Sequence, residues 1–161
     1  MIIVSNTTPL IGLASISHFD LLHKLFGTIY IPQAVYNEAV VDGHEEGGVK
    51  RELLAASWIK TVAVQDRLAV EVLLDDLDLG EAETIVLARE IGADWVLMDE
   101  KKGRRKLTQL GVPKVGTVGI LLKAKQSGFL PTIRQEMLWL REYGFSISQT
   151  VINAVLKEAG E

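Results

Sequence analysis

Short, largely apolar runs alternate with longer amphipathic segments along the chain. We expect strands at residues 2–4, 28–31, 58–62, 94–98 and 112–115. Most of these runs lack a regular polar alternation, which fits strands of a parallel sheet that is buried on both faces. Strands that alternate with helices predict an α/β fold with three layers, α/β/α, and a mostly parallel central sheet.

The intervals between the predicted strands have apolar residues at helical spacing. Thr8 followed by Pro9 is typical of an N-cap and a first helical position. Residues 42–48 (DGHEEGG) have the composition of a mobile loop. We see no stretch of linker character, and we expect one domain over residues 1–161 with the helices of residues 131–161 packed on it. The predicted helices cover residues 9–15, 18–25, 33–40, 49–56, 66–74, 81–91, 101–110, 116–125, 131–142 and 148–158.

The composition narrows the possible classes of protein. A chain of 161 residues with 48% hydrophobic residues can bury a full core. The absence of cysteine excludes disulfides, thiolate metal sites and a cysteine nucleophile. The apolar runs are too short to span a membrane and no export signal is visible, so we expect a cytoplasmic protein. A net charge of −4 gives no overall attraction for nucleic acid, so any such contact must use a local basic patch.

Four polar residues stand at positions that a parallel sheet would bring together. Asn6 and Asp99 follow apolar strands, Glu38 lies on the helix after the second strand, and Glu81 starts a helix after a glycine turn. Ligands of open α/β sheets bind where the strands end. Carboxylates gathered there would repel one another unless a cation neutralised them, and Mg²⁺ and Mn²⁺ prefer oxygen ligands. Such a site could activate water and stabilise charge on a phosphoryl group.

Each of the four residues also has a purely structural explanation. The helix dipole favours Glu81 in a first helical turn, and Asp99 could cap the helix that follows it. Glu38 could be a solvated residue at a helix edge, and Asn6 could be an ordinary turn residue. The joint arrangement of the four favours a metal site over any one of these explanations.

Several stretches of the chain resemble, in the same order, the PIN-domain family of small metal-dependent ribonucleases. This family includes the VapC toxins of toxin–antitoxin pairs. A largely uncharacterised prokaryotic PIN subfamily shares the Gly-Glu-Ala-Glu helix start. The resemblance extends over nearly the whole chain and is weakest over residues 42–74. The matching stretches are residues 3–10 (IVSNTTPL), 31–38 (IPQAVYNE), 79–83 (LGEAE), 97–100 (LMDE) and 116–121 (GTVGIL).

The resemblance implies a PIN-like fold and a metal-dependent endoribonuclease, toxin-like, that hydrolyses RNA phosphodiesters. The metal-binding positions of the family correspond to Asn6, Glu38, Glu81 and Asp99, of which the three acidic residues would be catalytic. Thr7 matches a small hydroxyl residue that supports the first of these positions. The implied cofactor is Mg²⁺ or Mn²⁺. The implied partners are an RNA substrate, a second copy of the chain in a homodimer and a cognate antitoxin.

Asn6 departs from the family, which has aspartate at this position. An amide oxygen can still contact a cation, but the site loses one of four negative charges. Three hypotheses stay open: a natural PIN protein of weak or absent activity, an engineered inactive variant, or a site in which Glu83 or Glu100 supplies the missing carboxylate. The alternative function is therefore a non-catalytic PIN-fold module that binds RNA or a protein partner. A phosphatase-like protein would need a nucleophilic aspartate at a strand end, which leaves only Asp99.

A run of basic residues directly follows the candidate site. Around a helix these side chains cannot all face one way, so a solvated helix face is one interpretation. The other interpretation is that Arg104 or Arg105 holds RNA phosphates beside the metal. The run consists of Lys101, Lys102, Arg104, Arg105 and Lys106.

Overall fold

The computed structural model describes residues 1–42 and 48–161, so most of the predicted mobile loop lies outside the described residues. Five strands form one parallel sheet in the order β3-β2-β1-β4-β5. This sheet confirms the predicted α/β fold. The strands are β1 (Ile3–Ser5), β2 (Ile29–Pro32), β3 (Ile59–Val62), β4 (Trp95–Leu97) and β5 (Lys114–Val115).

Helices connect these strands, and they follow the predicted segments closely. The segment predicted as a helix over residues 33–40 is helical throughout, but its α-helical first four residues give way to a π-helical turn. The helices are α1 (Thr7–Ser15), α2 (Asp20–Phe26), α3 (Gln33–Tyr36), the π-helical turn η1 (Asn37–Val41), α4 (Val49–Ala55), α5 (Arg67–Leu73), α6 (Leu79–Ile91), α7 (Lys101–Gln109), α8 (Thr117–Gln126), α9 (Arg134–Tyr143) and α10 (Gln149–Glu158).

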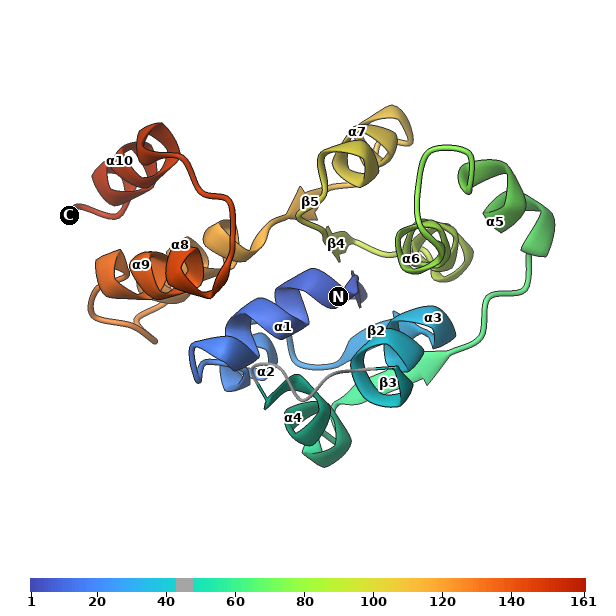
Figure 1. Cartoon of the computed structure of the whole chain (residues 1–161), viewed down its shortest axis with the longest axis horizontal. Helices are drawn as coiled ribbons and strands as arrows, with labels where there is room; N and C mark the ends of the chain where they lie inside the picture. Colours follow the sequence, from blue (N-terminus) through green and yellow to red (C-terminus); the bar gives the residue numbers. More distant parts are fainter. Residues whose placement is uncertain (43–47) are drawn as a thin grey trace.

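The helices form two layers with the sheet between them. Ile3 and Val4 of β1 point to opposite faces, and both are completely buried. Figure 1 shows α5, α6 and α7 on one side of the sheet and α1, α2, α8 and α9 on the other. Because each strand is covered on both faces, its apolar run needs no polar alternation. The predicted three-layer α/β/α architecture is thus confirmed.

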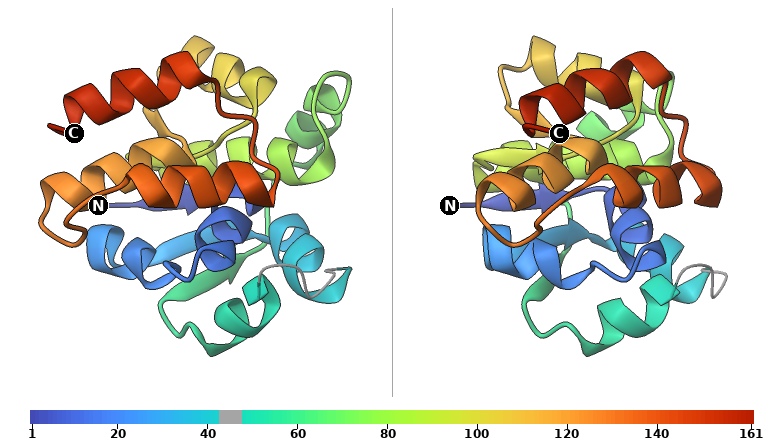
Figure 2. Two further views of the ribbon diagram at one scale, coloured as in Figure 1. Left: turned by 60° about the vertical axis from the view of Figure 1, so that its left-hand side comes forward. Right: turned by 90° about the vertical axis from the view of Figure 1, so that its left-hand side faces the viewer.

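The two C-terminal helices belong to one of these layers. Met137 and Leu140 of α9 and Ile152 and Leu156 of α10 are buried in the same apolar core as Ile3. Figure 2 brings α9 and α10 to the front of the molecule, and α10 packs against both α8 and α9. Across residues 1–42 and 48–161, no helix combines the length and the apolar character needed to cross a membrane.

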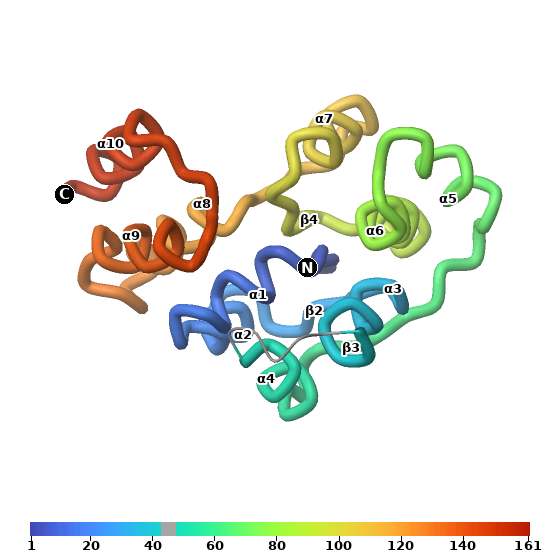
Figure 3. The backbone as a smooth tube through the Cα atoms, in the orientation of Figure 1, coloured from blue at the N-terminus to red at the C-terminus, as the bar shows by residue number. Residues whose placement is uncertain are grey.

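The order of the strands places β1 at the centre of the sheet. From β1 the chain proceeds to β2 and β3 on one side, and it returns through α6 to β4 on the other side of β1 (Figure 3). Where the connections that follow two neighbouring strands lead to opposite sides, a crevice forms beyond the carboxyl ends of these strands. This crevice is the usual ligand site of open α/β sheets. Asn6 follows β1 and Asp99 follows β4, so both lie at this crevice.

The start of α1 differs from the prediction. The helix begins at Thr7 with Asn6 as its N-cap, whereas we expected Thr8 as the cap and Pro9 as the first helical residue. The first backbone N–H groups of a helix have no partner within the helix, so a proline in the first turn costs no hydrogen bond. The cap position therefore belongs to the residue that is also the candidate metal ligand.

Candidate active site

Asn6 lies buried between the ends of the two central strands. Its backbone N–H donates to the Leu97 carbonyl oxygen over 3.0 Å, which continues the pairing of β1 with β4. Its side-chain Nδ2 donates to the Met98 sulfur atom over 3.5 Å. Asn6 is 4% exposed. Asn6 is thus held at the crevice by a strong hydrogen bond from its backbone and a weak hydrogen bond from its side-chain amide to a thioether.

Glu38 reaches the same region from the π-helical turn. The Asp42 N–H donates to the Asn37 carbonyl oxygen over 2.7 Å, an i→i+5 bond that defines the turn. Thr7 Oγ1 donates to Glu38 Oε2 over 2.8 Å. Single π-helical turns inside helices are frequent at functional sites. Thr7, which the family resemblance connects with the first metal position, holds the carboxylate of Glu38.

The carboxylate of Glu38 lies directly against the first turn of α6. A Cβ atom added to Gly80 would overlap Glu38 Oε1. A glycine at this position allows the carboxylate to approach the positive end of the helix dipole. Desolvation raises the pKa of Glu38, the hydrogen bond from Thr7 opposes this rise, and the nearby carboxylate of Asp78 adds to it.

Replacing Gly80 by alanine should displace the Glu38 carboxylate while the fold stays intact. The overlapping atom is the end of a flexible side chain, and alanine favours a helix by roughly 1 kcal/mol over glycine. We expect the free energy of unfolding to change by less than about 1 kcal/mol and the affinity for Mn²⁺ to fall. Thermal unfolding and calorimetric titration with Mn²⁺ measure the two effects.

The matched variant for this test is Thr7→Val, which removes the hydrogen bond to Glu38 without adding an atom near α6. Both variants should lower the affinity for Mn²⁺ to a similar extent. If Gly80→Ala instead destabilises the protein strongly, Gly80 is needed for helix packing and does not serve to admit Glu38.

Glu81 lies at the third position of α6, and its side chain closes a capping box. The Asp78 N–H donates to Glu81 Oε1 over 2.9 Å, and the Glu81 N–H donates to Asp78 Oδ1 over 2.8 Å. The helix therefore begins at Leu79, two residues before the predicted start. The reciprocal bonds satisfy two backbone donors at once. Glu81 thus has a structural role in this conformation, and the bond uses one of its two carboxylate oxygens.

Asp78 is a site residue that the sequence reasoning missed. It lines the same cleft as Glu81, and its carboxylate raises the pKa of both Glu38 and Glu81 after the larger effect of desolvation. The signal was present in the sequence, because an aspartate three residues before a glutamate at the start of a helix is typical of a capping box.

Asp99 is held by the helix that follows the neighbouring strand. The Thr117 N–H donates to Asp99 Oδ1 over 2.8 Å, and Thr117 Oγ1 donates to Asp99 Oδ2 over 2.7 Å. The structural alternative, in which Asp99 caps α7, is wrong because Glu100 occupies that N-cap. A Cβ atom on Gly116 would lie 3.0 Å from Asp99 Oδ1, so glycine permits this close approach.

Arg104 lies beside Asp99. Its Nη1 donates to the Met98 carbonyl oxygen over 2.9 Å, which fixes the guanidinium next to the candidate site. Desolvation raises the pKa of Asp99, whereas the hydrogen bonds from Thr117 and the charge of Arg104 oppose this rise. Arg104 therefore offsets part of the negative charge at the crevice. Arg105 lies exposed on the outer face of α7.

Glu81 and Asp99 line one cleft of about 920 Å³. Desolvation raises the pKa of both groups, and the charges of Asp78 and Glu100 raise that of Glu81 further. A cation in the cleft would counter this effect, since a positive charge favours the ionised form of a carboxyl group. The other residues that line the cleft are Thr8, Asp78, Glu100, Lys101, Lys102, Val118, Gly144, Phe145, Ser146, Ile147 and Val151.

The donor set suits a hard cation in its chemistry, but the acidic groups are not gathered around one point. Amide and carboxylate oxygens are the ligands that Mg²⁺ and Mn²⁺ prefer. In the part of the chain that the structure describes, no three His, Asp or Glu side chains lie close enough together to hold one ion. In this conformation Glu81 is bonded to Asp78, and Asp99 is bonded to Thr117.

Glu83 and Glu100 differ in their ability to replace the missing carboxylate at Asn6. The Ala34 N–H donates to Glu83 Oε1 over 2.9 Å, and Arg67 Nη1 donates to Glu83 Oε2 over 2.7 Å. Both oxygens of Glu83 are therefore engaged in structural bonds. Glu100 is exposed and lines the cleft with Asp99.

Comparisons with known proteins agree with this architecture. A family model described as DUF3368, PIN domain, matches residues 2–161. No curated protein was found that matches the chain. The family match covers nearly every residue, including all four candidate site positions. The chain therefore belongs to the PIN-domain family.

Proposed function

We propose that the protein is a metal-dependent endoribonuclease that hydrolyses RNA phosphodiesters at the crevice between β1 and β4. The observation that carries this proposal is the meeting of Glu81 and Asp99 in one cleft at the strand-order switch of a PIN domain. Asn6, Glu38, Glu81 and Asp99 would hold Mg²⁺ or Mn²⁺. When bound, the cation supplies activation of water and stabilisation of charge on the phosphoryl group.

The protein's own contribution is to orient the oxygen donors. Thr7 aims the carboxylate of Glu38, and Thr117 fixes both oxygens of Asp99. Asp78 holds Glu81 in the capping box, so Glu81 must leave that bond to take part in cation binding. The neutral amide of Asn6 lowers the negative charge of the site. We therefore expect weaker cation binding and lower activity than a site with four carboxylates would have.

We also propose that the protein has a toxin-like role, binds a cognate antitoxin and forms a homodimer. Membership of the PIN-domain family supports these proposals.

Calorimetric titration with Mn²⁺ tests the proposed function. The protein should bind Mn²⁺, and Asp99→Asn should reduce the affinity by about tenfold or more, because it removes one charge from the site. Cleavage of a labelled RNA should require the cation and should stop when EDTA is added. Asp20→Asn is the matched control, since it removes an exposed carboxylate on α2 that pairs with Lys24. Equal Mn²⁺ binding by the protein and by Asp99→Asn would contradict the proposal.

A non-catalytic PIN module is the second candidate function. It is favoured by the amide of Asn6, which donates to the Met98 sulfur and leaves the site one charge short. Such a module would bind RNA or a protein partner without hydrolysis. RNA binding without Mn²⁺ uptake and without cleavage would support this function.

A further inference from the structure

We propose that the outer face of α7 is a phosphate-binding track that holds the RNA strand as it leaves the cleft. The track consists of Lys102, Arg105 and Lys106, with Gln109 at its end. The inference rests on the proposed function, because it names the surface that binds the substrate of the same site. Its ligand is the sugar–phosphate backbone of a single RNA strand.

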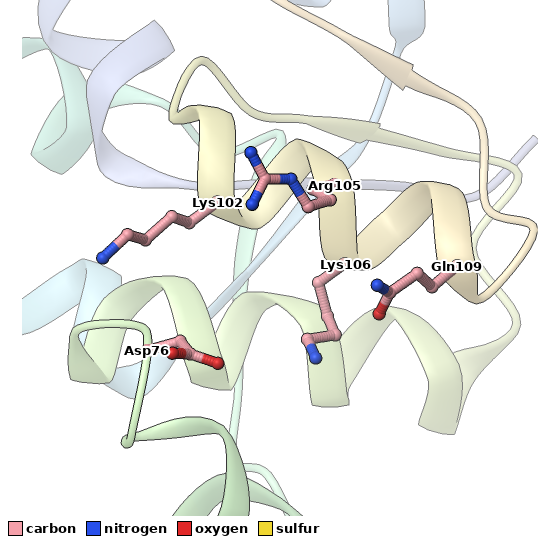
Figure 4. Close-up of a pocket in the computed structure, with 5 residues that line it drawn as sticks. All are labelled: Asp76, Lys102, Arg105, Lys106 and Gln109. Atoms are coloured by element: carbon pink, nitrogen blue, oxygen red, sulfur yellow. The ribbon is translucent and has the colours of Figure 1, made fainter.

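The four residues share one face of the helix. They follow one another at i, i+3, i+4 and i+7, and they line a hollow of about 200 Å³ together with Asp76. Figure 4 shows Lys106 and Gln109 extending from α7 toward α6, while Lys102 extends toward the side where Asp76 lies. The described residues that line this hollow are all polar or charged. The cationic ends of these side chains suit an anion with a high charge density.

The structure divides the basic run between two roles. Arg104 turns inward, where its Nη1 donates to the Met98 carbonyl oxygen beside Asp99. Gly103 and Leu107 are buried, and a Cβ atom on Gly103 would lie 2.8 Å from the Met98 sulfur. This close approach of α7 to the end of β4 keeps the outer basic face next to the candidate active site. Arg104 is thus a positioning residue, and it is not part of the track.

The track is continuous with the cleft. Lys102 lines both the hollow on α7 and the cleft that contains Glu81 and Asp99. An RNA strand whose reacting phosphate lies in the cleft can therefore place its next phosphates over Lys102 and Arg105. The whole chain has a net charge of −4, so this local patch has to supply the attraction for the strand.

The salt dependence of RNA binding tests the track. The probe is a fluorescein-labelled single-stranded oligouridylate, and its fluorescence anisotropy is measured in EDTA over a series of NaCl concentrations. The triple variant Lys102→Ala, Arg105→Ala, Lys106→Ala should bind about tenfold more weakly or worse. The slope of log K against log salt should become shallower by about 2, since each phosphate contact with a single strand contributes about 0.7.

A matched triple variant controls for the loss of charge. Arg51→Ala, Lys60→Ala, Lys157→Ala also removes one arginine and two lysines, all of them exposed and on other elements. It should bind the probe with nearly the affinity and the salt slope of the unchanged protein. Equal weakening by both triple variants would overturn the track, because it would show only a general attraction between charges.

A gain of affinity provides a test that misfolding cannot imitate. Asp76 is the carboxylate in the hollow and should repel a phosphate. Asp76→Asn should tighten binding of the oligouridylate by up to about fivefold, the range that exposed charge pairs produce. Asp75→Asn changes the same charge at the neighbouring exposed position and should have a smaller effect.

The remaining outcomes separate the track from the proposed function. If the protein cleaves RNA with Mn²⁺ but the α7 triple variant binds and cleaves like the unchanged protein, the track is wrong and the function stands. If RNA binds through α7 but no Mn²⁺ is taken up and no cleavage occurs, the track stands and the nuclease function fails. If the unchanged protein does not bind the oligouridylate at all, the track is overturned.

Discussion

Replacing Asn6 by aspartate should increase the affinity for Mn²⁺ and the rate of RNA cleavage by roughly 10- to 1000-fold. The new carboxylate would stand at the N-cap of α1, between the ends of β1 and β4. One added charge near a cation contributes up to about 4 kcal/mol at the effective dielectric constant of a partly solvated site. The lower limit of roughly 10-fold allows for the free-energy cost of desolvating a carboxylate at position 6, where the residue is only 4% exposed.

In the metal-free protein, Asn6→Asp should have a much smaller effect, and it should lower the thermal stability. An aspartate at a helix N-cap is favourable, but this one would also be desolvated close to other acidic groups. We therefore expect Asn6→Asp to lower the melting temperature slightly in EDTA and to raise it when Mn²⁺ is present. Mn²⁺ raises the melting temperature because it binds the folded state and not the unfolded chain.

Calorimetry with Mn²⁺ and a cleavage assay with labelled RNA measure the main effect. Asn153→Asp is the matched control, because Asn153 is exposed on α10 and its amide oxygen accepts a bond from Gln149 that a carboxylate can keep. Equal Mn²⁺ affinity in Asn6→Asp and the unchanged protein would show that Asn6 is not part of the cation site. Equal cleavage in both would support Glu100 as the residue that supplies the missing charge.

Replacing Glu83 by alanine should lower the free energy of unfolding by about 2–4 kcal/mol. The Glu83 side chain is 6% exposed, and it joins three segments by accepting bonds from the Ala34 N–H of α3 and from Arg67 at the start of α5. The variant would leave the Ala34 N–H without its partner and would open a cavity behind α6. Arg67 is 55% exposed and can be solvated by water, which limits the loss.

A graded series separates the contributions at this position. Glu83→Gln keeps the oxygen that accepts from Ala34 but loses the ion pair, so it should cost about 1 kcal/mol. For a protein of this size, each kcal/mol changes the melting temperature by about 2–4 °C. Thermal unfolding should thus show a fall of roughly 4–16 °C for Glu83→Ala and a smaller one for Glu83→Gln. A loss of Mn²⁺ affinity in Glu83→Gln, with the melting temperature unchanged, would assign Glu83 to the cation site instead.

The fold could be predicted from the sequence because its signals are local. The apolar runs that became β1 and β4 mark strands covered on both faces, and the alternation with helices requires parallel pairing. The positions of Asn6 and Asp99 followed from the same reasoning, because residues that end neighbouring parallel strands meet at one edge. Element boundaries were less certain, as the starts of α1 and α6 show.

The contacts of the site side chains could not be predicted in this way. Thr7 bonds to Glu38, 31 residues later, and Thr117 bonds to Asp99 across 18 residues. Such bonds depend on which helix the fold places beside each strand end, and hydrophobic spacing contains no information about that. The π-helical turn that aims Glu38 is likewise a consequence of packing, since its residues would also suit an ordinary helix.

By itself, the sequence determined the α/β architecture and the strand-end positions of Asn6 and Asp99, whereas the missing charge at Asn6 was evident only from the resemblance to the PIN-domain family. Only the tertiary structure decided that Thr7 holds Glu38, that Thr117 holds Asp99, and that the outer basic residues of α7 form a separate surface. The physical reason is that a strand or a helix follows from the spacing of apolar residues within one segment. The bonds of a polar side chain depend on neighbours that the fold brings in from elsewhere in the chain.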